Sequence, residues 1–314
     1  MRLQPMAIGS FIRILLQRLA SEQVQQTVAD NLRSAAQQKY RSGGAANEEK
    51  ESEDADSDDR DESAPNRELL PCHVGLVVAL PLESGYFEDR LAGVISIKGH
   101  GFTVRTGGLH GRGVAVAISG HGRAAAAQAA EALIAGHRPR WLISAGFAGG
   151  LQSELTRSDI VMADGVVGEH GERLSIDLRL PGGEEGLGRG IHVGRLLTVD
   201  RIIHKAGEKR ALGEQHQAIA VDMESLAVAQ VCQREKQRFL AIRAITDTVD
   251  DELPRDVERL LNRPTMVRKL GAAAGSLLRR PSAAKDLWKL RESAITAADR
   301  LAKFLVGVIQ QLPE

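Results

Sequence analysis

Two apolar segments that each lead into acidic residues place the strongest constraint on what this chain can fold into. Ala220 to Asp222 is predicted to be a short strand that runs through Glu224 into a helix. Phe239 to Ile245 is predicted to be a buried strand, and Asp247 follows just past its end. In open α/β sheets, ligands bind beyond the carboxyl ends of the strands. Glu224 and Asp247 are therefore expected at one site.

The middle of the chain alternates between predicted strands and helices. Residues 74–80 form a continuous apolar run, which is typical of a strand covered on both faces, and residues 123–135 are Ala-rich and helical. Further strands are expected at 94–97, 102–106, 114–118, 141–145, 160–163 and 192–197. This alternation predicts an α/β fold, a three-layer α/β sandwich with a mixed central sheet.

Changes in composition divide the chain into four regions. Residues 1–39 are expected to form an amphipathic helical arm, with the apolar side of Ile8 to Leu19 docked on the body, on a neighbouring subunit or on a membrane surface. Residues 40–68 form an acidic linker, predicted to be disordered because it has too little apolar surface to offset its ordering entropy. Residues 72–250 form the main domain. Residues 251–314 form a helical extension, whose apolar stripe from Leu287 to Leu312 packs on the body or on another subunit.

Composition argues against several classes of function. The formal net charge is zero, and ten acidic residues between Glu48 and Glu62 face only two basic ones. Because the remaining positive charge is spread out and aromatic residues make up 3%, nucleic-acid binding has little support. Cys72 and Cys232 are the only cysteines, which excludes a disulfide framework and a cysteine-rich zinc site and favours the cytoplasm. No run approaches the roughly 20 apolar residues that span a bilayer.

Short motifs are spread over residues 74–250. They are Gly75 to Ala79 leading to Glu83, Ser119 to Arg123, Ala145 to Leu151, Ser158 to Val161, Val221 to Glu224 and Arg243 to Asp247. In this order they resemble the purine nucleoside phosphorylase and nucleosidase superfamily, and they are most similar to its methylthioadenosine/S-adenosylhomocysteine nucleosidase-like branch. Asp251 to Pro254 and Ser276 to Ser282 resemble the hopanoid-associated phosphorylase subgroup.

The resemblance implies cleavage of the N-glycosidic bond of a purine nucleoside, with an acid at the base and an anion near the sugar. It implies that Asp247, oriented by Thr246, protonates N7, and burial beside an apolar strand would favour the protonated acid. It places Glu224 and Met223 at the ribose and Glu83 as the base that activates water. The alternatives are structural roles. Asp247 would cap a turn, Glu224 would be stabilised by the dipole of the helix that follows it, and Glu83 would be an exposed residue at the start of a helix.

Several residues are candidates for an anion or for the base pocket. Arg243 lies in an apolar strand and needs a partner, which could be Glu224, Glu83, a phosphate or a purely structural ion pair. The turn containing Ser119, Gly120 and Arg123 is a possible phosphate site. Asp222 is a candidate helix cap.

The chain departs from the nucleosidase pattern at two positions. Phe147 stands beside Gly149 where the family's glycine-rich turn usually has a serine, and Ile202 stands where a stacking phenylalanine is common. The segment from Asp164 to His192, which in the family helps enclose the 5′ side, is short.

The expected activity is cleavage of a 5′-substituted adenine nucleoside, such as S-adenosylhomocysteine, methylthioadenosine or an adenosyl lipid. The alternatives are a phosphate-dependent phosphorylase acting on adenosylhopane and, from another class, a non-catalytic nucleoside-binding module. No cofactor or metal is expected beyond phosphate as a co-substrate. The expected partners are a small-molecule nucleoside, further copies of the chain and, through the arm, a membrane surface.

Overall fold

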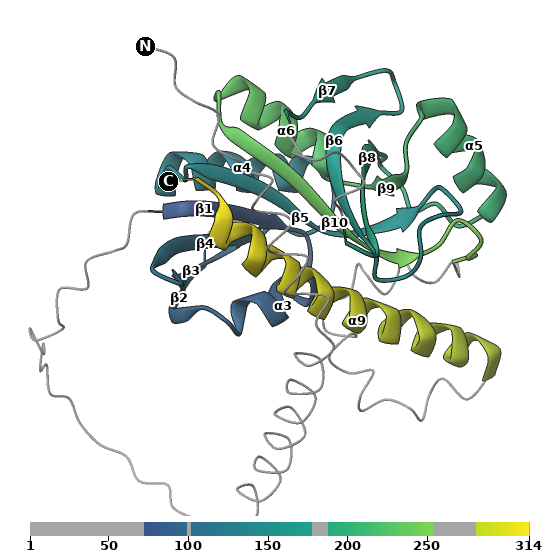
Figure 1. Cartoon of the computed structure of the whole chain (residues 1–314), viewed down its shortest axis with the longest axis horizontal. Helices are drawn as coiled ribbons and strands as arrows, with labels where there is room; N and C mark the ends of the chain where they lie inside the picture. Colours follow the sequence, from purple (N-terminus) through teal and green to yellow (C-terminus); the bar gives the residue numbers. More distant parts are fainter. Residues whose placement is uncertain (1–71, 99–101, 178–187, 254–280, 314) are drawn as a thin grey trace, which may run out of the picture.

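The computed structural model describes residues 72–98, 102–177, 188–253 and 281–313, which form a mixed α/β structure around a sheet of ten strands (Figure 1). The expected arm (1–39) and linker (40–68) lie outside the described residues. The strands are β1 Cys72–Val78, β2 Ala92–Lys98, β3 Thr103–Leu109, β4 Arg112–Ile118, β5 Trp141–Gly150, β6 Ile160–Gly168, β7 Arg173–Ser175, β8 Ile191–Thr198, β9 Ala220–Asp222 and β10 Arg238–Asp247. The helices are α3 Pro81–Glu88, α4 Arg123–His137, α5 Ala206–His216, α6 Ser225–Arg234 and α9 Pro281–Gln311.

Strand β5 is the centre of the sheet. On one side it pairs in parallel with β1, which pairs with β4, and β3 and β2 continue the sheet as antiparallel strands. On its other side β5 pairs with β10 in parallel, while on the β1 side, past the end of the β1 pairing, Gly149 and Gly150 pair with β9 in antiparallel orientation. Because β10 pairs with β6, β6 with β8 and β8 with β9, these strands return to β5 and form a closed circuit. The ends of β9 and β10 thus lie beside the same residue of β5, Gly149, on its two edges.

Two helical layers cover the sheet. Alternate residues of β1 point into different layers, as the two-residue period of a strand requires. Val77 packs in the cluster that contains Leu133 of α4 and Val231 of α6. Leu76 packs in the cluster that contains Phe87 of α3 and Leu301 of α9, on the opposite face (Figure 1). The expected α/β sandwich with a mixed sheet is confirmed.

Helix α9 packs on the main domain through its described part. Leu301, Leu305 and Ile309 are fully buried in the core cluster beside α3. Arg112 of β4 donates from Nη1 to the carbonyl oxygens of Ile309 (2.6 Å) and Leu312 (2.7 Å). These contacts satisfy carbonyl groups at the end of the helix, where no partner within the helix is available.

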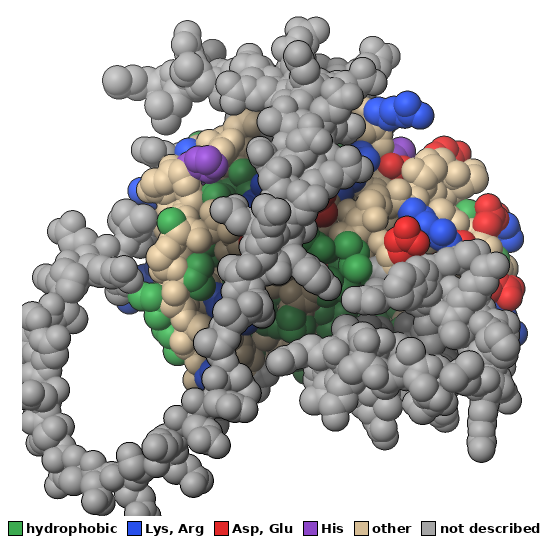
Figure 2. All heavy atoms as spheres, turned by 90° about the horizontal axis from the view of Figure 1, so that it is seen from below, with side chains coloured by type: hydrophobic (Ala, Val, Ile, Leu, Met, Phe, Trp, Pro, Cys, Tyr) green, Lys and Arg blue, Asp and Glu red, His purple; other side chains and the backbone are tan. Residues whose placement is uncertain are grey.

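The face below α9 and α3 carries a mixed surface. Figure 2 shows positive and negative side chains close together at one end of this face, with hydrophobic side chains also visible on it. The exposed large hydrophobic residues of the described chain are Tyr86 on α3 and Val94, Ile95 and Ile97 on the edge strand β2. No helix among the described residues is long and apolar enough to cross a membrane.

The structure differs from the sequence-based elements in three places. The strand expected to end at Ala145 continues to Gly150, so Phe147 and Gly149 lie in a strand rather than in a turn. Helix α5 was not predicted, because its sequence is mostly polar and charged. Helix α6 begins at Ser225, one residue after Glu224.

Candidate active site

Two glycines of β5 allow two carboxylates to approach the same strand. A Cβ atom at Gly146 would lie 2.6 Å from Oε1 of Glu83, and a Cβ atom at Gly149 would lie 2.9 Å from Oδ2 of Asp247. Both distances are shorter than real Cβ contacts, so a larger residue at either position would displace the carboxylate. Because the two glycines are three residues apart, the carboxylates flank positions separated by about 10 Å along β5.

Backbone groups fix the orientation of Glu83. Its Oε2 accepts hydrogen bonds from the N–H groups of Ala79 and Leu80, both at 2.8 Å, and its Oε1 accepts one from Phe147, also at 2.8 Å. Burial raises the pKa of the Glu83 carboxyl, while these hydrogen bonds and the charge of Arg243 lower it. Because the pKa is raised overall, Glu83 accepts a proton more readily than an exposed glutamate would.

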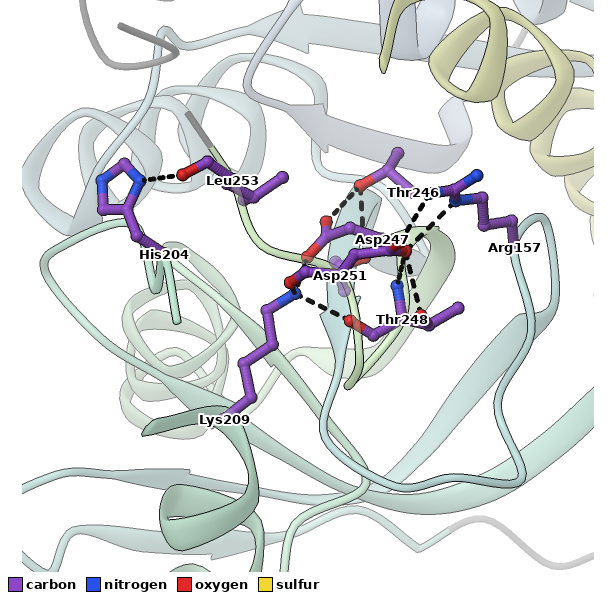
Figure 3. Close-up of polar contacts among 9 residues, drawn as sticks. Arg157, His204, Lys209, Thr246, Asp247, Thr248, Asp251 and Leu253 are labelled. Atoms are coloured by element: carbon purple, nitrogen blue, oxygen red, sulfur yellow. Dashed lines mark hydrogen bonds and ion pairs between the residues drawn. The ribbon is translucent and has the colours of Figure 1, made fainter. Parts of the chain in front are cut away.

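Asp247, at the end of β10, is held by a threonine and a lysine (Figure 3). Thr246 donates from Oγ1 to Oδ1 of Asp247 at 2.9 Å. Lys209 of α5 donates from Nζ to Oδ2 at 2.5 Å, and both side chains are buried. Apolar surroundings were expected for Asp247, but in the structure the ammonium group of Lys209 lies against it.

Glu224 joins the start of α6 to the turn before α4. Its Oε1 accepts a hydrogen bond from the N–H group of Gly122 at 2.8 Å. Glu224 and the neighbouring Met223 are half-buried. Burial raises the pKa of Glu224 to about 7, helped by the charges of Asp222 and Glu83 and opposed by Arg243. Glu224 therefore changes its charge near neutral pH.

The partner of Arg243 is Asp222, which corrects the expectation of Glu224, Glu83 or a phosphate. Nε of Arg243 donates to Oδ2 of Asp222 at 2.8 Å, and Nη2 lies 2.7 Å from the same oxygen. Nη2 also donates to Oγ of Ser144 at 2.8 Å. The pair forms because β9 and β10 flank β5 from opposite sides and bring Asp222 and Arg243 together there. Asp222 also accepts a hydrogen bond from the Ser225 N–H group at the start of α6, as expected for a cap.

We expect Arg243→Met to lower the free energy of unfolding by about 3–5 kcal/mol, because it leaves the buried Asp222 carboxylate without its counter-ion. Arg210→Met is the matched control, since Arg210 forms an exposed ion pair with Asp250 and its loss should cost less than about 1 kcal/mol. Urea unfolding of the two variants measures both effects. Equal stabilities would show that the buried pair is not a structural element of the site.

The donors considered for phosphate already have partners within the chain. Ser119 donates from Oγ to the carbonyl oxygen of Gly120 at 2.6 Å, and the N–H group of Gly120 donates to Ala79 O at 3.0 Å. Arg123 donates from Nη2 to Thr198 O at 3.0 Å and forms ion pairs with Glu172 and Asp200. A phosphate at this turn would therefore have to replace existing contacts.

The two departures from the nucleosidase pattern lie on different segments of the fold. Phe147 packs its half-buried ring against the core cluster that also holds α9, and only its backbone contacts Glu83. Ile202 is half-buried in the segment between β8 and α5. No group of His, Cys, Asp and Glu within the described residues is arranged to hold a metal ion.

Sequence reasoning overlooked Lys209, although a signal was present. Glu208, Lys209 and Arg210 look like a solvated charged run. However, Lys209 is three residues before Leu212 and seven before His216, so the helical period places all of them on one side. In the structure Lys209, Leu212 and His216 are indeed buried.

The comparison with protein families gives one match, which covers most of the chain. The model of the phosphorylase superfamily matches residues 73–182 and 178–279. This match confirms the resemblance found in the motifs of the sequence.

Solved structures with the same fold include nucleosidases from several bacteria. The 5′-methylthioadenosine/S-adenosylhomocysteine nucleosidase of Neisseria meningitidis, in complex with methylthio-immucillin-A, is 21% identical, with a TM-score of 0.59 over 76% of this chain and 99% of that one. The corresponding enzyme of S. pneumoniae, with a transition-state inhibitor, is 19% identical, with a TM-score of 0.58 over 77% and 100% of the two chains. Futalosine hydrolase of Helicobacter pylori is 18% identical, with a TM-score of 0.59 over 77% and 99%. At these identities the likeness is one of fold.

Proposed function

Because the chain belongs to the phosphorylase superfamily, and is thus a nucleosidase or nucleoside phosphorylase that cleaves the N-glycosidic bond of a nucleoside, we propose that it hydrolyses a 5′-substituted adenine nucleoside. One observation carries the proposal: Glu83 and Asp247 are held against the same strand, at Gly146 and Gly149. In the proposed reaction the first carboxylate is the base that activates water and the second is the proton donor to the leaving adenine.

Each residue of the site takes one role in this reaction. Glu83 accepts a proton from a water molecule while the oxygen of that water attacks the anomeric carbon of the ribose. As the glycosidic bond breaks, its electron pair moves to the adenine, and Asp247 gives a proton to N7. Glu224 accepts hydrogen bonds from the ribose hydroxyl groups, and the thioether of Met223 packs on the sugar face.

Water is favoured over phosphate by the contacts of the arginines. Arg243 is paired with Asp222, and Arg123 is bound to Thr198 and to two carboxylates. Glu83, by contrast, is buried and has a raised pKa, which suits a general base. Phosphorolysis, including that of an adenosyl lipid such as adenosylhopane, is the alternative, and it differs from hydrolysis in requiring phosphate for the release of adenine.

The experiment compares methylthioadenosine, S-adenosylhomocysteine, adenosine and an adenosyl lipid as substrates of the full chain. We expect adenine release from the 5′-substituted nucleosides, with a kcat/KM at least tenfold above that of adenosine. Liquid chromatography of the free base measures the release. Release from adenosine alone, or from none of the four, would reject the proposed substrate class.

The charge of Glu224 predicts how substrate binding depends on pH. Below its pKa of about 7 the carboxyl group is protonated, and above that value it is a carboxylate. Because a carboxylate accepts stronger hydrogen bonds from hydroxyl groups, KM should fall about tenfold as the pH rises through 7. In Glu224→Gln the KM should be high and independent of pH over this range. A pH-dependent KM in that variant would assign the effect to another group.

A further inference from the structure

Lys209 is an unusual feature of this site, because its charged side chain is fully buried. Its residue is 0% exposed, and its ammonium group contacts three oxygen atoms (Figure 3). Nζ donates to Oδ2 of Asp247 at 2.5 Å, to the carbonyl oxygen of Thr248 at 2.8 Å and to that of Asp251 at 3.0 Å. A lysine ammonium has three donors, so all of them are used.

Asp247 has no other ionisable partner among the described residues. Its second oxygen accepts from the hydroxyl group of Thr246, and only 6% of the residue is exposed. The surrounding charges are bonded elsewhere: Asp251 to Arg157, Asp250 to Arg210 and Glu208 to Arg201, while Nδ1 of His204 lies 3.0 Å from the carbonyl oxygen of Leu253. The proton nearest to the Asp247 carboxylate is thus one on Lys209.

We propose that Lys209 is a positioning residue and that, through Asp247, it supplies the proton taken up by the leaving base. This role of Lys209 rests on the proposed function. A proton moves from Nζ of Lys209 to Oδ2 of Asp247, which converts the ion pair into a neutral amine and a carboxylic acid. The acid gives this proton to N7 as the electron pair of the glycosidic bond moves onto the adenine. After product release, Glu83 gives the proton that it took from water to the solvent and the amine of Lys209 takes one up from the solvent, which restores the carboxylate and the ion pair.

The low dielectric of the site supports this transfer. A buried ion pair is stabilised only weakly over its neutral form, because both charges have lost their hydration. A bound nucleoside would exclude further water from Asp247. The hydrogen bond of 2.5 Å between Nζ of Lys209 and Oδ2 of Asp247 gives the proton a direct path between the two side chains.

The test compares two leaving groups in Lys209→Met, whose unbranched side chain is one atom shorter and has no proton to give. Methylthioadenosine releases adenine, which needs protonation, whereas 4-nitrophenyl 5-methylthioriboside releases nitrophenolate, which does not. We expect kcat for methylthioadenosine to fall at least 100-fold and kcat for the nitrophenyl riboside to change less than threefold. Equal losses for the two substrates would mean that Lys209 only holds the fold, and would overturn the proposal.

Because both rates are measured on one sample, their ratio does not depend on the fraction of protein that is folded. Arg210→Met is the control on the same helix, since Arg210 is exposed and paired with Asp250, and neither rate should change. Asp247→Asn should show the same selective loss, and the double variant with Lys209→Met should lose no more than Asp247→Asn alone. Additive losses would contradict a shared path for the proton.

A second variant provides the same test should Lys209→Met be insoluble. This variant is Lys209→Arg, which keeps a positive charge beside Asp247 but holds its protons too tightly to give one up, so the wild-type ratio of the rate on methylthioadenosine to the rate on the nitrophenyl riboside should fall in this variant. A ratio equal to that of the wild type would overturn the role of Lys209 and leave the proposed function standing. A wild-type enzyme that cleaves the nitrophenyl riboside but no adenine nucleoside would overturn both.

Discussion

Replacing Asp247 with asparagine is expected to lower kcat for adenine release by about 1,000-fold, because an amide has no acidic proton to give to N7. The substitution keeps the size of the side chain and its contact with the Thr246 hydroxyl group. The dissociation constant of a non-cleavable substrate analogue should therefore change less than threefold. Steady-state kinetics and calorimetric binding measure the two quantities.

The matched control for this prediction is Asp250→Asn. Asp250 lies three residues further along the chain but is exposed and paired with Arg210. Its replacement should leave both kcat and binding unchanged. A kcat for Asp247→Asn within a factor of two of the wild type would remove Asp247 as the acid.

Replacing Glu83 with glutamine is expected to lower hydrolysis by about 100- to 10,000-fold, because an amide cannot take the proton from the attacking water. An amide also has one acceptor oxygen, whereas Glu83 uses both of its oxygens to accept backbone N–H groups. We therefore also expect a loss of stability of about 1–3 kcal/mol. Initial rates and thermal unfolding of the same preparation separate the two effects.

Glu88→Gln provides a matched control on the same helix. Glu88 is 7% exposed, close to the 5% of Glu83, but it pairs with Arg105 and not with β5. Its replacement should lower stability while leaving kcat for the folded enzyme unchanged. If Glu83→Gln lost stability but kept its turnover, water activation would have to be assigned to another residue.

The sequence predicts the sheet well where apolar runs are continuous. The strands around Leu76, Val116 and Ile242 were expected because each lies in an apolar run, and each is fully buried. Asp247 lies at the end of β10 and Glu224 lies between the end of β9 and the start of α6, as expected, because the ends of elements follow directly from the end of an apolar run. Local pattern was sufficient for these elements.

The remaining features depend on contacts between distant segments. Gly146 and Gly149 suggest a turn in the sequence, but in the structure they make room for carboxylates from α3 and β10. The helical period indicates the burial of Lys209, but its partner Asp247 and the partner of Arg243 follow from which strands and helices meet beside β5, and no local period encodes these pairs. The expected arm, linker and membrane contact lie outside the described residues and stay predictions.

The identity of the sugar product tests the central claim most directly. The full-length enzyme is incubated with S-adenosylhomocysteine in phosphate-free buffer and again with phosphate added, and the sugar product is identified by its mass. The account predicts adenine and a free sugar at the same rate in both buffers. Release of adenine only when phosphate is present, together with a sugar 1-phosphate, would contradict it.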